Sequence, residues 1–316
     1  MDTRKSTRLS FRLASGMATL LLTGTQLPAA QPDLPFDLRQ LSIGLPEAGA
    51  PRAVVGPHAV TTSTIAAAPG LQIYHPRELS GFTGKDALPI VVWGNGACLA
   101  DGKDFAGFLS TIASYGFLVV GSAAVPGNPQ ARITSTNLIK ALDWAEAEGN
   151  RKGSPLAGRI RGDAVAVMGM SCGGNLALEA ARDPRVKTLG MWNSGVWITG
   201  EMRTGDGTLL VATTKADLAH VHGPTLYING DKIDPAMANA ADDVERLQGI
   251  PVFFGSRHGS GHSGTYSHAN GGEFANIAVA WLRWQLKADR GSAKMFTGPD
   301  CSLCRDPNWT VRRKGL

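Results

Sequence analysis

The stretch AVAVMGMSCGGNLALEAAR (residues 164–182) contains the change of pattern that decides the fold. Residues 164–168 form a short apolar run, typical of a buried strand in a parallel sheet. Residues 175–182 have the character of a helix. Between them lies Gly169-Met170-Ser171-Cys172-Gly173, a G-x-S-x-G motif. A strand and a helix joined by this motif predict a nucleophile elbow, a sharp turn that presents the hydroxyl of Ser171.

The glycines of this motif have a physical reason. The turn holds the serine in a strained backbone conformation, and its neighbours must be small for the chain to close around it. The N-terminus of the following helix then points the N–H of Cys172 at a developing negative charge. Ser171 is therefore the predicted nucleophile and Cys172 a predicted oxyanion-hole donor. The alternative is an ordinary Gly-rich turn.

Outward from the elbow, strand patterns alternate with helix patterns. Further strands are expected at residues 71–75, 88–93, 117–120, 186–192, 225–228 and, as the last strand, 252–254. Further helices are expected at residues 105–113, 138–145, 236–247 and 274–285. This alternation predicts an α/β fold with a mostly parallel central sheet and helices on both faces. We expect residues 31–316 to form a single catalytic domain.

A serine hydroxyl needs a general base, and the base needs an acid that orients it. In this kind of fold the acid and then the histidine follow the serine in chain order. His262 lies in a Gly-rich loop after the expected last strand, with His258 as the second choice. Asp234 is the preferred acid because it sits further into its loop than Asp231, which could make an ordinary turn.

The second oxyanion donor should come from the loop after an earlier strand. That loop is Gly94-Asn95-Gly96-Ala97, and the N–H of Ala97 or Gly96 would donate. A plain tight turn is the alternative.

Four cysteines are present, an even number that suggests disulfides in an exported protein. Cys98 follows the predicted oxyanion loop and Cys172 follows the nucleophile, so a disulfide between them is plausible. Two buried free thiols are the alternative. Cys301 and Cys304 form an isolated C-x-x-C, for which we expect a structural disulfide rather than a zinc or redox site.

Residues 1–30 resemble a signal peptide, with a basic start, an apolar segment and a small-residue cleavage site. A disordered basic tail is the alternative. The protein should be secreted or periplasmic, and no later stretch is apolar enough to span a membrane. The whole chain has a formal charge of +5, and residues 1–30 contain four basic residues and one acidic residue. The remainder is only mildly basic, and we expect no partnership with nucleic acid or membrane.

Several of these motifs resemble the α/β-hydrolase superfamily, especially its secreted cutinase-like and dienelactone-hydrolase-like branch, which includes polyester hydrolases. The acid loop (residues 224–234), the histidine loop (259–263) and the last helix (280–289) are similar to that branch. The resemblance covers about residues 70–305. It departs at the oxyanion loop, where cutinases usually have Ser-Pro-Gly and an aromatic residue, so it does not imply a cutinase-like substrate.

Residues 93–98, 171–174 and 261–266, with the final C-x-x-C, also look like the secreted bacterial poly(aspartic acid) hydrolases. That resemblance implies cleavage of amide bonds in an anionic polymer. The alternative is a polyester hydrolase or carboxylesterase, which aromatic residues near the site, such as Trp192 and Trp197, would favour. From another class, the chain could be a non-catalytic binding module on a hydrolase fold. No motif predicts a metal or a cofactor.

Overall fold

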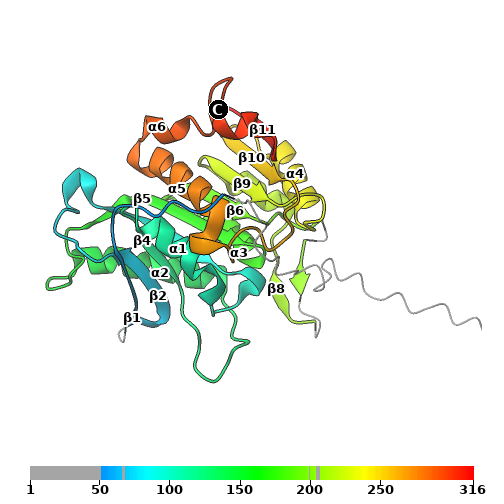
Figure 1. The fold of residues 1–316 in the computed structure, drawn as a ribbon. Coiled ribbons are helices and arrows are strands. Elements are labelled where there is room, and N and C mark those ends of the chain that lie inside the picture. Colours follow the sequence, from blue (N-terminus) through cyan, green and yellow to red (C-terminus); the bar gives the residue numbers. More distant parts are fainter. Residues whose placement is uncertain (1–50, 66–67, 199, 204–206) are drawn as a thin grey trace, which may run out of the picture. The chain divides into compact units, whose positions relative to one another are not determined.

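The computed structural model describes residues 51–65, 68–198, 200–203 and 207–316. Its centre is a nine-stranded sheet in the order β1-β2-β4-β3-β5-β6-β9-β10-β11 (Figure 1). The strands of this sheet are β1 (Val60–Ile65), β2 (Ala68–Pro76), β3 (Leu88–Gly94), β4 (Leu118–Ser122), β5 (Ile160–Met170), β6 (Val186–Trp192), β9 (Thr225–Asn229), β10 (Val252–Arg257) and β11 (Trp309–Lys314). In this spatial order, the strands from β4 through β3, β5, β6 and β9 to β10 run parallel. The antiparallel pairs lie at the two edges of the sheet.

Helices cover both faces of this sheet. On one face lie α1 (Ala106–Ala113) and α5 (Gly272–Lys287), and on the other α2 (Ser135–Asn150), α3 (Cys172–Ala180) and α4 (Met237–Arg246). Two short helices, α6 (Arg290–Ala293) and α7 (Ser302–Arg305), follow α5. Short 3-10 turns span Gly84–Asp86, Gly96–Cys98, Lys103–Phe105, Lys215–His220 and Ala269–Gly271. The predicted mostly parallel sheet with helices on both faces is confirmed.

The two faces of the sheet hold separate apolar cores, because successive side chains of a strand point to opposite sides. In β3, Ile90 and Val92 belong to the core beneath α2 and α3. Val91 and Trp93 belong to the core beneath α1 and α5. A strand buried on both faces has no polar side to alternate with, which is why β3 and residues 164–170 of β5 read as continuous apolar runs.

One expectation about the sheet is wrong: β10 is not its last strand. The segment Trp309–Lys314 forms β11, which pairs antiparallel with β10 from Val252↔Lys314 to Arg257↔Trp309. Arg312, Arg313 and Lys314 make this segment too charged to resemble a core strand. An edge strand needs only partial burial, and charged side chains on an edge discourage pairing with other molecules. The sequence analysis also missed β1 and the small hairpin of β7 (Met202–Arg203) and β8 (Leu209–Val211).

The predicted signal peptide, residues 1–30, lies outside the described residues. Within the described ranges, none of the helices has both the length and the apolar character that a membrane crossing requires.

Candidate active site

Ser171 stands at the junction of β5 and α3, in a backbone conformation that few residues other than glycine adopt (φ 53°, ψ −121°). The adjoining backbone leaves no room for side chains. A Cβ on Gly169 would lie 2.2 Å from the carbonyl oxygen of Gly173, and a Cβ on Gly173 would lie 2.1 Å from that of Gly94. These contacts explain the glycines of the motif and confirm the predicted strand–turn–helix geometry. Ser171 itself is 8% exposed.

The histidine and the acid chosen from the sequence lie beside this serine. His262 Nε2 is 2.9 Å from Ser171 Oγ, and His262 Nδ1 is 2.7 Å from Asp234 Oδ1. The three residues follow β5, β9 and β10, so they meet where the carboxyl ends of parallel strands share one edge of the sheet. An ionised Asp234 can only accept hydrogen bonds, so Nδ1 donates to it and Nε2 is left to accept the serine proton.

The carboxylate of Asp234 is buried and fully hydrogen-bonded. Oδ1 accepts from His262 and from the N–H of Ala236 at 3.0 Å, and Oδ2 accepts from Asn193 Nδ2 and the N–H of Gly230, both at 2.9 Å. Burial alone would raise the pKa of this carboxyl, but the hydrogen bonds and the charge of His262 outweigh it, so its pKa lies below the ordinary value. Asp234 is therefore a carboxylate at neutral pH.

The two alternative residues have other partners. Asp231 accepts from the N–H of Lys232 at 2.7 Å and of Gly259 at 3.2 Å, which ties the acid loop to the histidine loop. His258 is exposed, and its Nε2 lies 2.8 Å from Thr310 Oγ1 on β11. Neither belongs to the chain of hydrogen bonds that leads to Ser171.

Asn193 and Tyr266 support this chain and were not identified from the sequence. Asn193, at the end of β6 with a φ of 39°, donates from Nδ2 to Asp234 and to the carbonyl oxygen of Gly261 at 3.2 Å. The hydroxyl of Tyr266 donates to Asn193 Oδ1 at 3.1 Å. An asparagine after a strand is an ordinary turn signal, so only its position after a parallel strand, at the same sheet edge, could have pointed to it.

The base of the histidine loop is closed by a buried ion pair. Arg257 Nε, at the end of β10, lies 2.7 Å from Glu273 Oε2, at the start of α5. Trp309 Nε1 of β11 donates to the other oxygen of Glu273 at 2.8 Å. The N–H of His258 donates to the carbonyl oxygen of Asn308 at 2.8 Å. Residues of β10, α5 and the segment entering β11 thus fasten the loop that holds His262.

The predicted oxyanion loop forms a tight turn beside the nucleophile. Ala97 and Cys98 both have positive φ, 52° and 53°. Asn95 is buried beneath the turn and donates from Nδ2 to Ser122 Oγ at 3.0 Å and to the carbonyl oxygens of Leu99 and Ala100 at 3.0 and 3.3 Å. Arg132 donates to the carbonyl oxygen of Ala97.

Both expected disulfides are present. Cys98 pairs with Cys172, and Cys301 pairs with Cys304. The alternative of two buried free thiols is therefore wrong. The first bond joins the turn after β3 to the first residue of α3.

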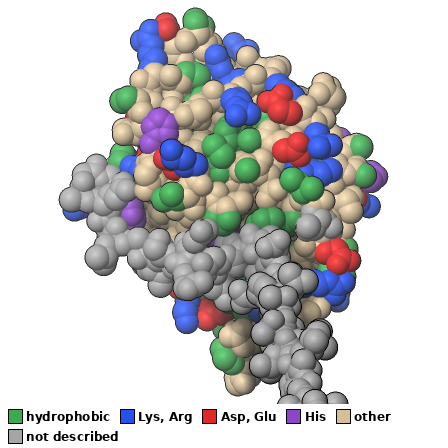
Figure 2. All heavy atoms as spheres, turned by 90° about the vertical axis from the view of Figure 1, so that its right-hand side faces the viewer, with side chains coloured by type: hydrophobic (Ala, Val, Ile, Leu, Met, Phe, Trp, Pro, Cys, Tyr) green, Lys and Arg blue, Asp and Glu red, His purple; other side chains and the backbone are tan. Residues whose placement is uncertain are grey.

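Apolar side chains are exposed next to residues of the site. Ile198 follows the half-buried Trp197 and is 80% exposed, and Ile233 precedes Asp234 and is 57% exposed. Trp192 is fully buried against Phe108 and Phe274, so it belongs to the core and cannot touch a substrate. On the face that Figure 2 shows, Lys and Arg side chains are interspersed with Asp and Glu and form no continuous basic field. Over the residues described, no group of three or more His, Cys, Asp or Glu could hold a metal ion.

The fold and the placement of Ser171 on its strand–turn–helix are those of an α/β-hydrolase. A comparison with protein families goes further, since residues 44–308 match the family described as PET hydrolase-like. The chain belongs to that family and is a serine hydrolase that acts on esters. A comparison with curated proteins gives no match. The family match does not extend to poly(aspartic acid), and it agrees better with the polyester alternative.

Proposed function

We propose that this protein is a secreted polyester hydrolase that works through an acyl-enzyme, with Ser171, His262 and Asp234 as its catalytic triad. The hydrogen-bonded chain from Ser171 Oγ through His262 to Asp234 is the observation on which this proposal depends. Its members occur in the chain order, and at the strand ends, that the fold requires.

In the proposed reaction, Ser171 Oγ attacks the carbonyl carbon of the ester while its proton passes to His262 Nε2. The N–H groups of Cys172 and Ala97 stabilise the tetrahedral oxyanion. Collapse of that intermediate breaks the ester C–O bond, and the leaving alkoxide takes the proton from His262. Water then attacks the acyl-enzyme and gives a proton to His262. Collapse of the second tetrahedral intermediate breaks the bond to Ser171 Oγ, which takes that proton back from His262, and the carboxylic acid is released.

The composition of the loops around the triad supports a neutral, apolar polymer as substrate. Trp197, Ile198 and Ile233 supply apolar surface in the segments that follow β6 and β9. Across residues 94–99, 193–198, 229–234 and 258–266, Lys232 is the one Lys or Arg, and Arg132 reaches the carbonyl oxygen of Ala97 from outside these segments. The carboxylates of an anionic polymer lose water when they bind, so they would need several Lys or Arg side chains as partners at the site. These features favour a polyester over poly(aspartic acid).

A substrate panel tests this proposal. The purified protein is assayed on short p-nitrophenyl esters, an aliphatic polyester, an aromatic polyester and poly(aspartic acid), beside Ser171→Ala as the matched inactive control. We expect hydrolysis of the esters and at least one polyester, with loss of about four or more orders of magnitude in Ser171→Ala. Turnover of poly(aspartic acid) alone, or near-normal activity of the variant, would contradict it.

Secretion is the second part of this proposal. Two disulfides are typical of a protein that matures in an oxidising compartment outside the cytoplasm. Mass spectrometry of the exported protein should find a new N-terminus near residue 30. An exported protein that retains residues 1–30 would contradict the signal peptide.

A further inference from the structure

The disulfide Cys98–Cys172 lies between the two groups proposed to bind the oxyanion. It joins segments 74 residues apart, and both cysteines are fully buried. Cys98 directly follows Ala97, the proposed donor of the turn after β3. Cys172 directly follows Ser171 and provides the other proposed donor through its own backbone N–H. The bond therefore connects the two halves of the oxyanion hole.

The backbone around this bond is strained. In the described part of the chain, six residues other than glycine have a positive φ, and three of them, Ala97, Cys98 and Ser171, lie at this junction. Such conformations cost free energy and persist only where the surroundings enforce them. Packing of Gly94 against Gly173 and the hydrogen bonds of Asn95 hold the base of the turn. The disulfide holds its far end, beside Ala97.

Building on the function proposed above, we propose that the Cys98–Cys172 disulfide is a positioning element of the oxyanion hole. It keeps the N–H of Ala97 and the N–H of Cys172 pointing at the same oxyanion, because it prevents Ala97 and Cys98 from leaving their left-handed backbone conformation. An oxyanion donor acts only when it points at the place the charged oxygen will occupy, and losing one such donor typically costs about 10²–10³ in kcat. The bond should therefore affect kcat more than KM.

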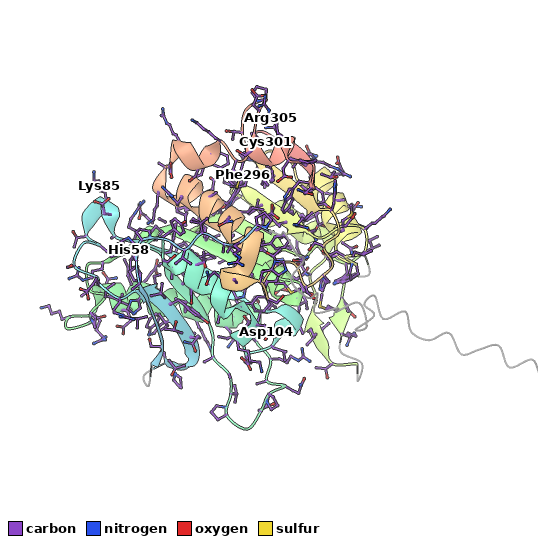
Figure 3. All side chains as sticks on the ribbon, in the orientation of Figure 1. His58, Lys85, Asp104, Phe296, Cys301 and Arg305 are labelled. Carbon is purple, nitrogen blue, oxygen red and sulfur yellow. A yellow bond between two sulfur atoms is a disulfide. The ribbon has the colours of Figure 1, made fainter. Side chains whose placement is uncertain are left out.

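The second disulfide provides a matched control. Cys301–Cys304 spans only three residues and lies next to α7. Figure 3 shows Cys301 and Arg305 at the top of the view and Asp104, which belongs to the segment following the oxyanion turn, well below them. Removing this bond changes the protein's cysteine content in the same way, and neither cysteine belongs to the proposed triad or to the oxyanion turn.

The test compares Cys98→Ala/Cys172→Ala with Cys301→Ala/Cys304→Ala on a soluble p-nitrophenyl ester. In the first variant we expect kcat to fall by about 10- to 100-fold with KM within about threefold of wild type. A boronic acid, which forms a tetrahedral adduct with Ser171, should lose affinity by a similar factor. The second variant should stay within about threefold of wild type in all three quantities.

Reduction of the folded enzyme provides a second measurement. In Cys301→Ala/Cys304→Ala a phosphine and water can reduce the remaining disulfide to two thiols, giving the phosphine oxide, and air can later re-form the bond. Because both cysteines are buried, thiol alkylation and mass spectrometry first establish that the bond is reduced, and kcat is measured on that form. We expect kcat to fall and recover while the far-UV circular dichroism stays constant. Full kcat in a form lacking the Cys98–Cys172 bond would overturn the proposal. The proposal would also be overturned if both the Cys98→Ala/Cys172→Ala variant and the reduced protein were unfolded even at low temperature. The bond would then contribute to overall stability and not specifically to the oxyanion hole.

Failure of the proposed function would look different. In that case the wild-type enzyme would not hydrolyse the ester, or Ser171→Ala would retain activity. Both results are independent of the cysteine variants.

Discussion

The two sides of the active site are held by different kinds of interaction. On the nucleophile side, the turn after β3 and the start of α3 touch through backbone atoms and are joined by the Cys98–Cys172 bond. On the acid–base side, the loops after β6, β9 and β10 are linked by side-chain hydrogen bonds of Asn193, Asp231 and Asp234. The nucleophile side therefore tolerates almost no added atom. The acid–base side has one such close approach, that of Gly230 to the carbonyl oxygens of Ser260 and Gly261, and can otherwise be weakened one hydrogen bond at a time.

The largest effect should follow from adding one methyl group to the nucleophile side. In Gly173→Ala the new Cβ would need to share space with the carbonyl oxygen of Gly94, so the elbow cannot form as it stands. We expect loss of nearly all activity and a clear drop in Tm. Gly81→Ala is the control, since no atom lies within 4 Å of its Cβ position. Equal Tm and activity in the two variants would contradict the backbone packing described here.

Next in size is the loss of the negative charge that orients His262. Asp234→Asn keeps the shape of the side chain but favours the wrong tautomer of the histidine, which typically costs about 10³–10⁴ in kcat. Asp231→Asn should lose less than about tenfold, because Asp231 contacts only backbone N–H groups of the adjoining loops. Steady-state kinetics on one ester compare the two variants, and the reverse ranking would assign the acid to Asp231.

A smaller loss is expected where a single supporting side chain is removed. Asn193→Ala deletes the links to Asp234 and to Gly261 and should lower kcat by about 10- to 100-fold with little change in KM. Tyr266→Phe removes only the hydrogen bond to Asn193 and should cost less than about tenfold. Kinetics of the double variant test the coupling, since a shared network requires the two effects to be less than additive.

The last effect leaves the catalytic rate and concerns stability against pH, and it compares two buried carboxylates. Burial raises the pKa of Asp243 to about 6, even though Lys215 Nζ lies 2.6 Å away. Between pH 3.8 and about 6 the native protein holds a proton that the unfolded chain has released, so this group's contribution to stability falls as pH rises. Asp234 has a lowered pKa, so its contribution is lost only as pH falls below the ordinary range.

Denaturant unfolding of wild type and Asp243→Asn from pH 4 to pH 7 measures this difference. The free-energy advantage of the wild type should shrink by about 2 kcal/mol across that range, because a pKa shift of roughly two units is worth about 3 kcal/mol in full and part of it falls below pH 4. An advantage that grows with pH would show that Lys215 outweighs the cost of burial.

The three residues proposed as the catalytic triad could be brought together from the sequence because each follows a recognisable strand. Ser171 lies between an apolar run and a helix, and Asp234 and His262 follow apolar strands in the expected order. Asn193 escaped notice because its role depends on the distance to Asp234, a contact 41 residues away in sequence. Strand β11 was not predicted because an edge strand needs no apolar pattern. Trp192 and Trp197 looked equivalent in sequence, and only the packing of Phe108 and Phe274 separates the buried one from the other.

The attachment of β11 to the histidine loop has a consequence for the order in which the enzyme matures. Chains are synthesised from the N-terminus, so Ser171, Asp234 and His262 all emerge before Asn308 and Trp309. The loop that holds His262 is fastened by those two later residues, through the carbonyl oxygen of Asn308 and the indole N–H of Trp309. A nascent chain therefore contains every reactive group before it contains the residues that hold His262 in place. Assembly of the proposed reactive centre therefore waits for residues that are made well after Ser171.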